Sequence, residues 1–259
     1  MKYGICMLAA VAVREAPSMK SQMTNQLLFG ELVIINDTVN DWFLTETADD
    51  GFTGWVQNNQ LKELSKADFN TLKEAKPYYL QTLSAQIKVN KSIIPVFRGA
   101  RFHGWKQGVF TIAGEKYYYK KAVHGVPENA GSREILKVAG YYLNVPYLQG
   151  GRTPLGIDGA ALVQMAFKMN GINLPRYADQ QVGKGEQILF VEASAPGDLA
   201  FFESDDGTIS HVGIILKGNK ILHSSGKVRI DTLDHQGIFN TEAGKYTHRL
   251  RVVKRIIQL

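Results

Sequence analysis

The spacing of apolar residues changes at Pro127, and that change limits the folds open to this chain. Before Pro127, apolar residues alternate over short runs that are separated by turn signals, which is typical of β-strands. After it, they recur first at helical spacing and then alternate again. We therefore predict an α+β protein in which small β modules precede a domain whose helices come before its antiparallel strands.

The part of the chain before Pro127 predicts two β modules. Residues 1–64 contain several short strands, including a hairpin around Asp49-Asp50-Gly51, and predict a small all-β barrel. The charged segment 65–77 is compatible with a helix that Pro77 ends, and we expect a linker there. Residues 78–126 predict a second, irregular β module.

The part after Pro127 predicts one domain over residues 127–259. Apolar residues recur at helical spacing from Ser132, which can cap a first helix. A second helix is predicted from Asp158 to Met169, with Gly171 where a C-terminal glycine belongs. Strands are then predicted at residues 198–202, 211–216, 220–223, 228–230 and 250–256.

Composition excludes several classes of protein. The chain has 30 lysines and arginines against 24 acidic residues, a net charge of +6, and these charges are scattered. We therefore expect no nucleic-acid partner, although attraction to an anionic polymer stays open. The single cysteine, Cys6, allows neither a disulfide nor a thiolate zinc site. No apolar run reaches the ~20 residues that span a bilayer, and the first residues lack a clear signal peptide, so we expect a cytoplasmic protein.

Several separated motifs after residue 130 carry a resemblance to a known family. They are Pro146 to Arg152, Gly156 to Gln164, Leu174 to Arg176, Gln180-Gln181, Pro196 to Phe202, Ser210 to Ile214, and Ile221 to Gly226. In this order and spacing they resemble the NlpC family of papain-like cysteine peptidases, which cut bacterial cell-wall peptides. The two β modules are similar to the bacterial SH3-like domains that precede this catalytic domain in wall-peptide recycling enzymes.

The resemblance implies a site built around a cysteine at the start of the second predicted helix. The helix dipole and a nearby imidazole keep such a thiol ionised, while one histidine acts as base and a second orients it. His211 matches the base and His223 the orienting residue. The family motif reads Asp-Cys-Ser-Gly, whereas this chain reads Asp158-Gly159-Ala160-Ala161, so the nucleophile is missing. Because that loss costs on the order of 10⁶ in rate in a triad hydrolase, we predict no useful peptidase activity.

The same resemblance implies a set of substrate contacts. They fall on Tyr147, Asp158, Ala160, Arg176, Tyr177 and Glu31. Asp158 would help to bind the free amine of the substrate, and Glu31 of the first module would close the cleft. Two positions depart from the family pattern: Gln149 stands where Trp is usual, and Tyr177 stands where relatives have Asp.

Each of these positions also has a purely structural interpretation. Asp158 suits an N-cap, which is compatible with substrate binding as well. Tyr147 suits core packing, Arg176 a surface cation, and Glu31 a solvated carboxylate at a strand edge. Cys6 lies among apolar neighbours, which favours a small buried side chain over a replacement nucleophile. The histidines that match no motif are predicted on the surface or in loops: His103, His124, His235 and His248.

We therefore expect a scaffold of the NlpC type that has lost catalysis and at most binds a peptide. The family reaction cleaves the bond between γ-D-glutamate and the diamino acid in murein peptides with a free N-terminal L-alanine. One alternative is a non-enzymatic scaffold that binds wall polymer or a partner through its SH3-like modules. Another is a metal site of His211, His223 and Asp158, whose side chains suit zinc. The resemblance itself implies no cofactor and no metal.

Overall fold

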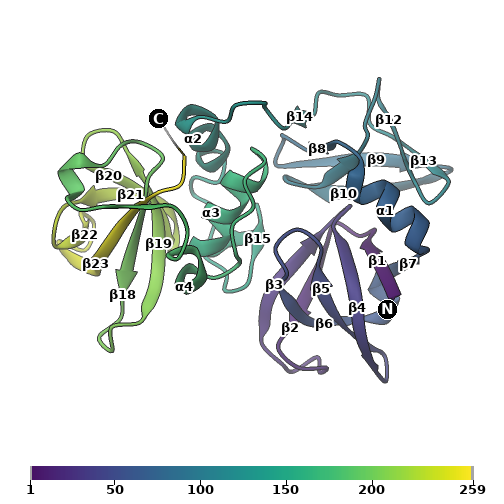
Figure 1. Ribbon diagram of the computed structural model, residues 1–259, viewed down its shortest axis with the longest axis horizontal. Helices are drawn as coiled ribbons and strands as arrows, with labels where there is room; N and C mark the ends of the chain where they lie inside the picture. Colours follow the sequence, from purple (N-terminus) through teal and green to yellow (C-terminus); the bar gives the residue numbers. More distant parts are fainter. Residues whose placement is uncertain (1, 258–259) are drawn as a thin grey trace. The chain divides into compact units, whose positions relative to one another are not determined.

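A computed structural model describes residues 2–257 of the chain (Figure 1). It divides into two compact units, Met1–Val126 and Pro127–Leu259, and the second begins where the sequence pattern changes. Within residues 2–257, no helix combines the length and the apolar character that crossing a membrane requires. The two units are described separately below.

An antiparallel sheet forms the first part of the first unit. Its strands are β1 (Lys2–Cys6), β2 (Ala10–Arg14), β3 (Met23–Leu28), β4 (Leu32–Val39), β5 (Trp42–Thr47), β6 (Thr53–Gln57) and β7 (Leu61–Leu64), with a 3₁₀ turn at Asn58–Gln60. They lie in the order β3-β2-β6-β5-β4-β1-β7. Alternate apolar residues of β2 and β4, such as Val11, Val13 and Val33, point into a common core. The hairpin predicted around Asp49-Asp50-Gly51 joins β5 to β6.

The segment predicted as a linker is instead a packed helix, α1 (Lys66–Glu74). Ser65 caps it by accepting a hydrogen bond from the backbone N–H of Asp68 at 3.0 Å. Phe69 and Leu72 are buried in a core that also takes residues from both β modules. The two predicted modules therefore share one core, in which Phe29 of the first contacts Phe102 and Phe110 of the second.

Two small sheets complete the first unit. The strands are β8 (Pro77–Tyr79), β9 (Ser84–Val89), β10 (Ser92–Phe97), β11 (Arg101–His103), β12 (Val109–Ile112), β13 (Glu115–Tyr118) and β14 (His124–Gly125). Their orders are β10-β9-β13-β12 and β11-β8-β14. The prediction that His103 lies on the surface is wrong, since its side chain is buried and contacts the carbonyl oxygens of Leu72 and Gly30.

The second unit places helices beside an antiparallel sheet that closes on itself. The helices are α2 (Ser132–Gly140), α3 (Gly159–Lys168) and α4 (Ala178–Gln181), and a 3₁₀ turn spans Val191–Ala193. The strands are β15 (Arg152–Thr153), β16 (Gly156–Ile157), β17 (Glu186–Ile188), β18 (Leu199–Glu203), β19 (Ile209–Leu216), β20 (Lys220–Ser225), β21 (Lys227–Leu233), β22 (Gly237–Asn240) and β23 (Lys245–Arg255). The large sheet runs β17-β23-β18-β19-β20-β21-β22, and the extra pairing of β22 with β23 closes β18 to β23 into a six-stranded barrel.

Helix α3 is the central helix of this unit, and it packs against β19 and β20 (Figure 1). Its apolar residues Leu162, Met165 and Ala166 are buried, as the helical spacing predicts. Asp158 is its N-cap, and Gly171 beyond its end has a φ of +85°, a conformation that glycine adopts without strain. For α2, the predicted cap is one residue off: Gly131 takes that place, and its N–H donates to the Glu134 carboxylate at 3.2 Å.

Candidate active site

The first residue of α3 faces the first residue of the predicted histidine pair. A Cβ built on Gly159 would lie 3.2 Å from His211 Nδ1, 3.1 Å from His211 Cε1 and 3.2 Å from the carbonyl oxygen of Val212. Gly159 has no left-handed φ, so its backbone suits any residue at the start of a helix. A side chain at this position would therefore point at the imidazole, and in this chain there is none.

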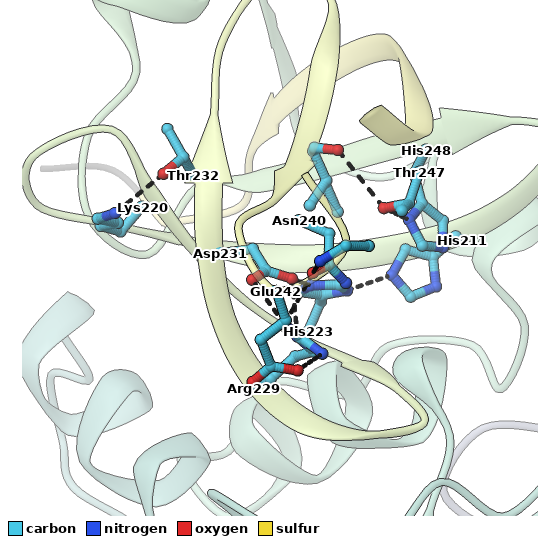
Figure 2. Close-up of polar contacts among 12 residues, drawn as sticks. His211, Lys220, His223, Arg229, Asp231, Thr232, Asn240, Glu242, Thr247 and His248 are labelled. Atoms are coloured by element: carbon cyan, nitrogen blue, oxygen red, sulfur yellow. Dashed lines mark hydrogen bonds and ion pairs between the residues drawn. The ribbon is translucent and has the colours of Figure 1, made fainter. Parts of the chain in front are cut away.

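Behind His211, neighbouring strands place two further polar groups in a line (Figure 2). His211 lies on β19, His223 on β20 and Asp231 on β21. His211 Nε2 is 3.0 Å from His223 Nδ1, and His223 Nε2 is 3.1 Å from Asp231 Oδ2. We call these three residues the relay. Because the Asp231 carboxylate accepts only, His223 Nε2 carries the hydrogen and His223 Nδ1 accepts from His211 Nε2.

Burial controls the charge of the relay. It lowers the pKa of His211 well below its ordinary value, and the nearby imidazoles of His248 and His223 lower it further. Burial also lowers the pKa of His223, against the opposing effect of Asp231. At neutral pH both imidazoles are therefore neutral, and His211 is able to accept a proton on Nδ1, the nitrogen that faces Gly159.

A third imidazole, which the sequence did not single out, joins the relay. The His248 ring, from β23, stacks on the His211 ring with centroids 4.2 Å apart. Its ring centroid is 5.7 Å from that of His223. The prediction that His248 is a surface or loop residue is thus wrong. No local motif surrounds it, and only the closure of the barrel through β22 and β23 brings it to this place.

On the opposite wall, Asp158 organises the start of α3. Its Oδ1 accepts from Ala161 N–H at 2.8 Å and from Arg176 Nη1 at 3.0 Å. Its Oδ2 accepts from Gly150 N–H at 2.9 Å and from Arg176 Nη2 at 2.5 Å. These four bonds occupy the usual accepting capacity of a carboxylate, so Asp158 acts as the expected N-cap and its charge is already paired. Arg176 is 2% exposed, so it is not the surface cation considered from the sequence.

We call the side that carries His211 the strand wall and the side that carries Asp158 at the start of α3 the helix wall. The cleft between them has a volume of about 250 Å³. It is lined by Tyr147, Gln149, Asp158, Gly159, Ala160, Arg176, Tyr177, Ala178, Asp179, Ile209, Ser210 and His211. Tyr147 is 42% exposed rather than part of the core, and its hydroxyl donates to Gln149 Oε1. Burial and the negative charge of Asp158 raise the pKa of Tyr147, so its hydroxyl is protonated at neutral pH.

The structure thus brings together most of the residues singled out from the sequence. Seven of them line the cleft: Tyr147, Asp158, Gly159, Ala160, Arg176, Tyr177 and His211. His223 lies behind His211 in the relay. Sequence reasoning missed Asp179, an exposed carboxylate at the start of α4 that also lines the cleft. Asp179 lies between the motifs that end at Arg176 and begin at Gln180, so no pattern in the sequence singled it out.

Two residues of the first unit complete the comparison with the sequence. Glu31 is buried, not solvated at a strand edge, and its Oε2 accepts from Leu28 N–H at 2.9 Å. Cys6 is fully buried in β1, as predicted, and its Sγ is 3.4 Å from the carbonyl oxygen of Leu8. Burial raises the pKa of the Cys6 thiol to about 12, so the group is protonated and does not act as a nucleophile.

Two regions of the chain match known families. Residues 144–245 match the NlpC/P60 family, and residues 9–62 match the bacterial SH3 domain. A γ-D-glutamyl-L-lysine dipeptidyl-peptidase of Bacillus subtilis is 29% identical over 214 residues, which cover 77% of this chain and 71% of that protein. Dipeptidyl-peptidase 6 of Lysinibacillus sphaericus is 26% identical, over 85% of this chain and 88% of its own length.

Solved structures give the same fold. An NlpC/P60 family protein from Bacillus cereus superposes with a TM-score of 0.84 at 18% identity, over 99% of this chain and 100% of that one. An NlpC/P60 endopeptidase from Photobacterium damselae superposes with a TM-score of 0.74 at 15% identity, over 96% of this chain and 70% of that one. The chain thus carries a bacterial SH3 domain at residues 9–62 ahead of an NlpC/P60 domain at residues 144–245.

Proposed function

We propose that this chain binds a short murein peptide, L-Ala-γ-D-Glu-diamino acid, in the cleft of its second unit and does not hydrolyse it. One observation carries the proposal. The base and its relay are assembled, while the residue that His211 faces is a glycine without a side chain. The chain therefore has a peptidase cleft without a group that attacks a peptide bond.

The absence of hydrolysis follows from the chemistry at the start of α3. Gly159 has no side chain, and the next residue, Ala160, offers only a methyl group. Neutral His211 is ready to take a proton, but no thiol is present at position 159 to give one. Loss of the nucleophile costs on the order of 10⁶ in rate in a triad hydrolase, so turnover falls to background.

Retention of binding follows from the rest of the cleft. Because Asp158 and Arg176 neutralise each other, the exposed carboxylate of Asp179 gives the cleft a net negative charge. That charge suits the ammonium group of a free N-terminal alanine. The Asp158 carboxylate already accepts four hydrogen bonds and has no free acceptor position for this group. The named relatives are dipeptidyl-peptidases, and the Bacillus subtilis protein bears γ-D-glutamyl-L-lysine in its name, which supports a peptide of this class.

The experiment is a calorimetric titration of the full chain with L-Ala-γ-D-Glu-L-Lys. We expect a saturable heat that returns to baseline after each injection, and intact peptide when the sample is analysed afterwards by chromatography. The matched control is the N-acetylated tripeptide, which lacks the free amine and should bind more weakly. Continuing heat with released dipeptide would contradict the loss of catalysis, and the absence of any heat would contradict binding.

A second function is favoured by the bacterial SH3 domain at residues 9–62. In this alternative the chain is a scaffold that binds wall polymer through its first unit, whose second module we also assign as SH3-like. Cosedimentation with insoluble murein separates the two functions. Polymer binding that survives the double change His211→Ala and His223→Ala, together with no heat from the tripeptide, would favour the scaffold.

A further inference from the structure

We propose that His211, His223 and His248 form a binding site for a divalent transition metal, with zinc as its natural occupant. The three histidines come from β19, β20 and β23, and one ring nitrogen from each lies within 4.8 Å of those of the other two. Three imidazoles and an open fourth position are a known ligand set for zinc. This site differs from the one considered from the sequence, since Asp158 is not among its members.

The distances suit a metal with little movement. Zn–N bonds of ~2.0–2.1 Å in a tetrahedral site hold the ligating nitrogens about 3.3 Å apart. His211 Nε2 and His223 Nδ1 are already 3.0 Å apart, and their rings are nearly perpendicular at 84°. The rings of His211 and His248 are stacked at 4.2 Å and must separate by about 1 Å to point at one ion. His248 is only half-buried, which leaves room for that shift.

The hydrogen bonds around the cluster leave a lone pair on the ligating nitrogens of His223 and His248, whereas His211 Nε2 carries a hydrogen (Figure 2). His223 Nε2–H donates to Asp231, so His223 Nδ1 is the acceptor. Thr247 gives its hydroxyl hydrogen to the carbonyl oxygen of Ile238, so its Oγ1 accepts from His248 Nδ1–H at 2.9 Å and His248 Nε2 is free to ligate. A metal displaces the Nε2 hydrogen of His211, which moves to Nδ1 on the side of Gly159.

A carboxylate behind one ligand supports the assignment. Asp231 is 1% exposed and receives the Nε2–H of His223, which is the carboxylate–histidine arrangement that orients imidazole ligands in zinc sites. Arg229 in turn holds Asp231, with Nε 2.8 Å from Asp231 Oδ2.

The position of His248 leaves the metal accessible. His248, Thr247 and Ser210 line a surface hollow of about 820 Å³, and Ser210 also lines the peptide cleft. A fourth ligand, water or an anionic group of a small molecule, therefore has a route to the ion. Because the metal replaces the hydrogen between His211 and His223, metal binding and the proton relay of an intact peptidase exclude each other.

The test uses the full chain without an affinity tag, stripped with a chelator and titrated with Zn²⁺ by calorimetry and with Co²⁺ by visible absorption. We expect one metal ion per chain and the visible bands of tetrahedral Co²⁺. His248→Ala should weaken zinc binding at least about 100-fold, since loss of a ligand costs more than the 10–100-fold loss of an outer-shell partner. The matched control is His124→Gln, a half-buried histidine of the first unit, which should change the affinity less than about twofold.

A second variant and a second readout keep the test decisive. His248→Asn retains a polar side chain of similar size, and thermal unfolding without metal shows whether either variant is folded. No metal uptake by the folded parent chain would overturn the site. Equal zinc affinity in the parent chain and in a folded His248 variant would overturn it as well, because the ion would then lie elsewhere.

Discussion

The strand wall and the helix wall of the cleft differ in the polar side chains that they provide. The strand wall holds a complete relay in which His211, His223 and Asp231 are joined by hydrogen bonds of 3.0 and 3.1 Å. The helix wall holds a complete helix start, with Asp158 capping α3 and paired to Arg176, but Gly159 has no side chain to face His211. The strand wall therefore has a hydrogen-bonded set of groups that can move a proton, whereas the helix wall has an ordered helix start without a reactive side chain.

The difference shows that architecture and reactivity are separable at a helix N-terminus. The cap, the ion pair and the buried apolar face of α3 all fix the helix without using the side chain at position 159. Ala160 and Ala161 also favour the helix by up to about 1 kcal/mol each over residues with lower propensity. The residues of the relay, in contrast, depend on one another. His223 and Asp231 are buried, and their polar groups are stabilised by the hydrogen bonds within the relay.

The largest expected effect comes from returning a nucleophile to the helix wall. Gly159→Cys places its Cβ 3.1–3.2 Å from the His211 ring, a tight fit that a shift of a few tenths of an ångström relieves. The thiol then lies at a helix N-terminus next to a neutral imidazole, which favours the thiolate. We expect cleavage of L-Ala-γ-D-Glu-L-Lys to rise between about 10³-fold and 10⁶-fold over the parent chain, measured by chromatography of the products with a chelator present.

Two variants control this gain. Ala160→Cys moves the thiol one residue along α3, away from His211, and should leave cleavage at background. Gly159→Cys combined with His211→Ala should lose the gain, because the thiol then has no base. A folded Gly159→Cys chain that binds the tripeptide but does not cleave it would show that the strand wall does not activate a thiol at position 159. The two walls would then not differ in reactivity.

The next effect compares two thiols in one chain. Burial raises the pKa of the Cys6 thiol to about 12, so at pH 8 only about one molecule in 10⁴ carries the thiolate. The thiol introduced by Gly159→Cys should have a pKa below its ordinary value and be largely ionised at pH 8. With a disulfide reagent at pH 8, we expect one fast thiol in the variant and none in the folded parent chain.

The pH dependence gives the contradicting outcome for this comparison. The rate of the fast thiol should stay level from pH 8 to 9, because that group is already ionised. A rate that keeps rising tenfold per pH unit over this range would show an unperturbed or raised pKa, and the helix wall would then lack the electrostatic environment that activates a thiol.

How far the sequence determined this site depends on the range of the interactions involved. The cap at Asp158, helix α3 and the glycine after it were predicted because their signals lie within one turn of the residue concerned. The pair of His211 and His223 was predicted from motifs that sit on two adjacent strands. Local patterns therefore predicted both walls as separate pieces.

The parts that escaped prediction all depend on distant pairings. His248 reaches His211 only because β23 pairs with both β18 and β22 and closes the barrel. Asp231 reaches His223 through the register of β20 with β21. In the first unit, the sequence predicts a helix-compatible linker at 65–77 but not its packing, since nothing in that charged segment shows that Phe69 and Leu72 meet a core shared by two β modules.

A third effect, on stability, compares the carboxylates of the two walls. Asp158 and Asp231 are both nearly fully buried and each is paired with an arginine. Asp158→Ala and Asp231→Ala should each lower the free energy of unfolding by about 3–5 kcal/mol, because each removes one member of a buried ion pair that also accepts further hydrogen bonds, from Gly150 and Ala161 or from His223. Asp205→Ala, at an exposed turn, is the matched control and should change it by less than about 0.5 kcal/mol.

Urea unfolding followed by circular dichroism measures all three variants. A loss below about 1 kcal/mol for Asp158→Ala, with the expected loss for Asp231→Ala, would show that the helix wall does not depend on its cap and ion pair. The order of the helix wall would then depend on the buried apolar face of α3 alone.

The smallest effect concerns the peptide itself and the one carboxylate of the cleft that the sequence did not point to. Asp179 is exposed, so its attraction for the ammonium group of the peptide is screened by water and should amount to about 0.2–1 kcal/mol. Asp179→Asn should therefore weaken binding of L-Ala-γ-D-Glu-L-Lys about 1.4-fold to fivefold in calorimetry. Raising the salt concentration should reduce the difference between this variant and the parent chain.

Glu192→Gln removes an exposed carboxylate of the same unit that does not line the cleft, and it should leave the affinity unchanged. If both variants bind as tightly as the parent chain at low salt, the amine is held by neutral groups of the cleft, and the helix wall contributes shape rather than charge to recognition.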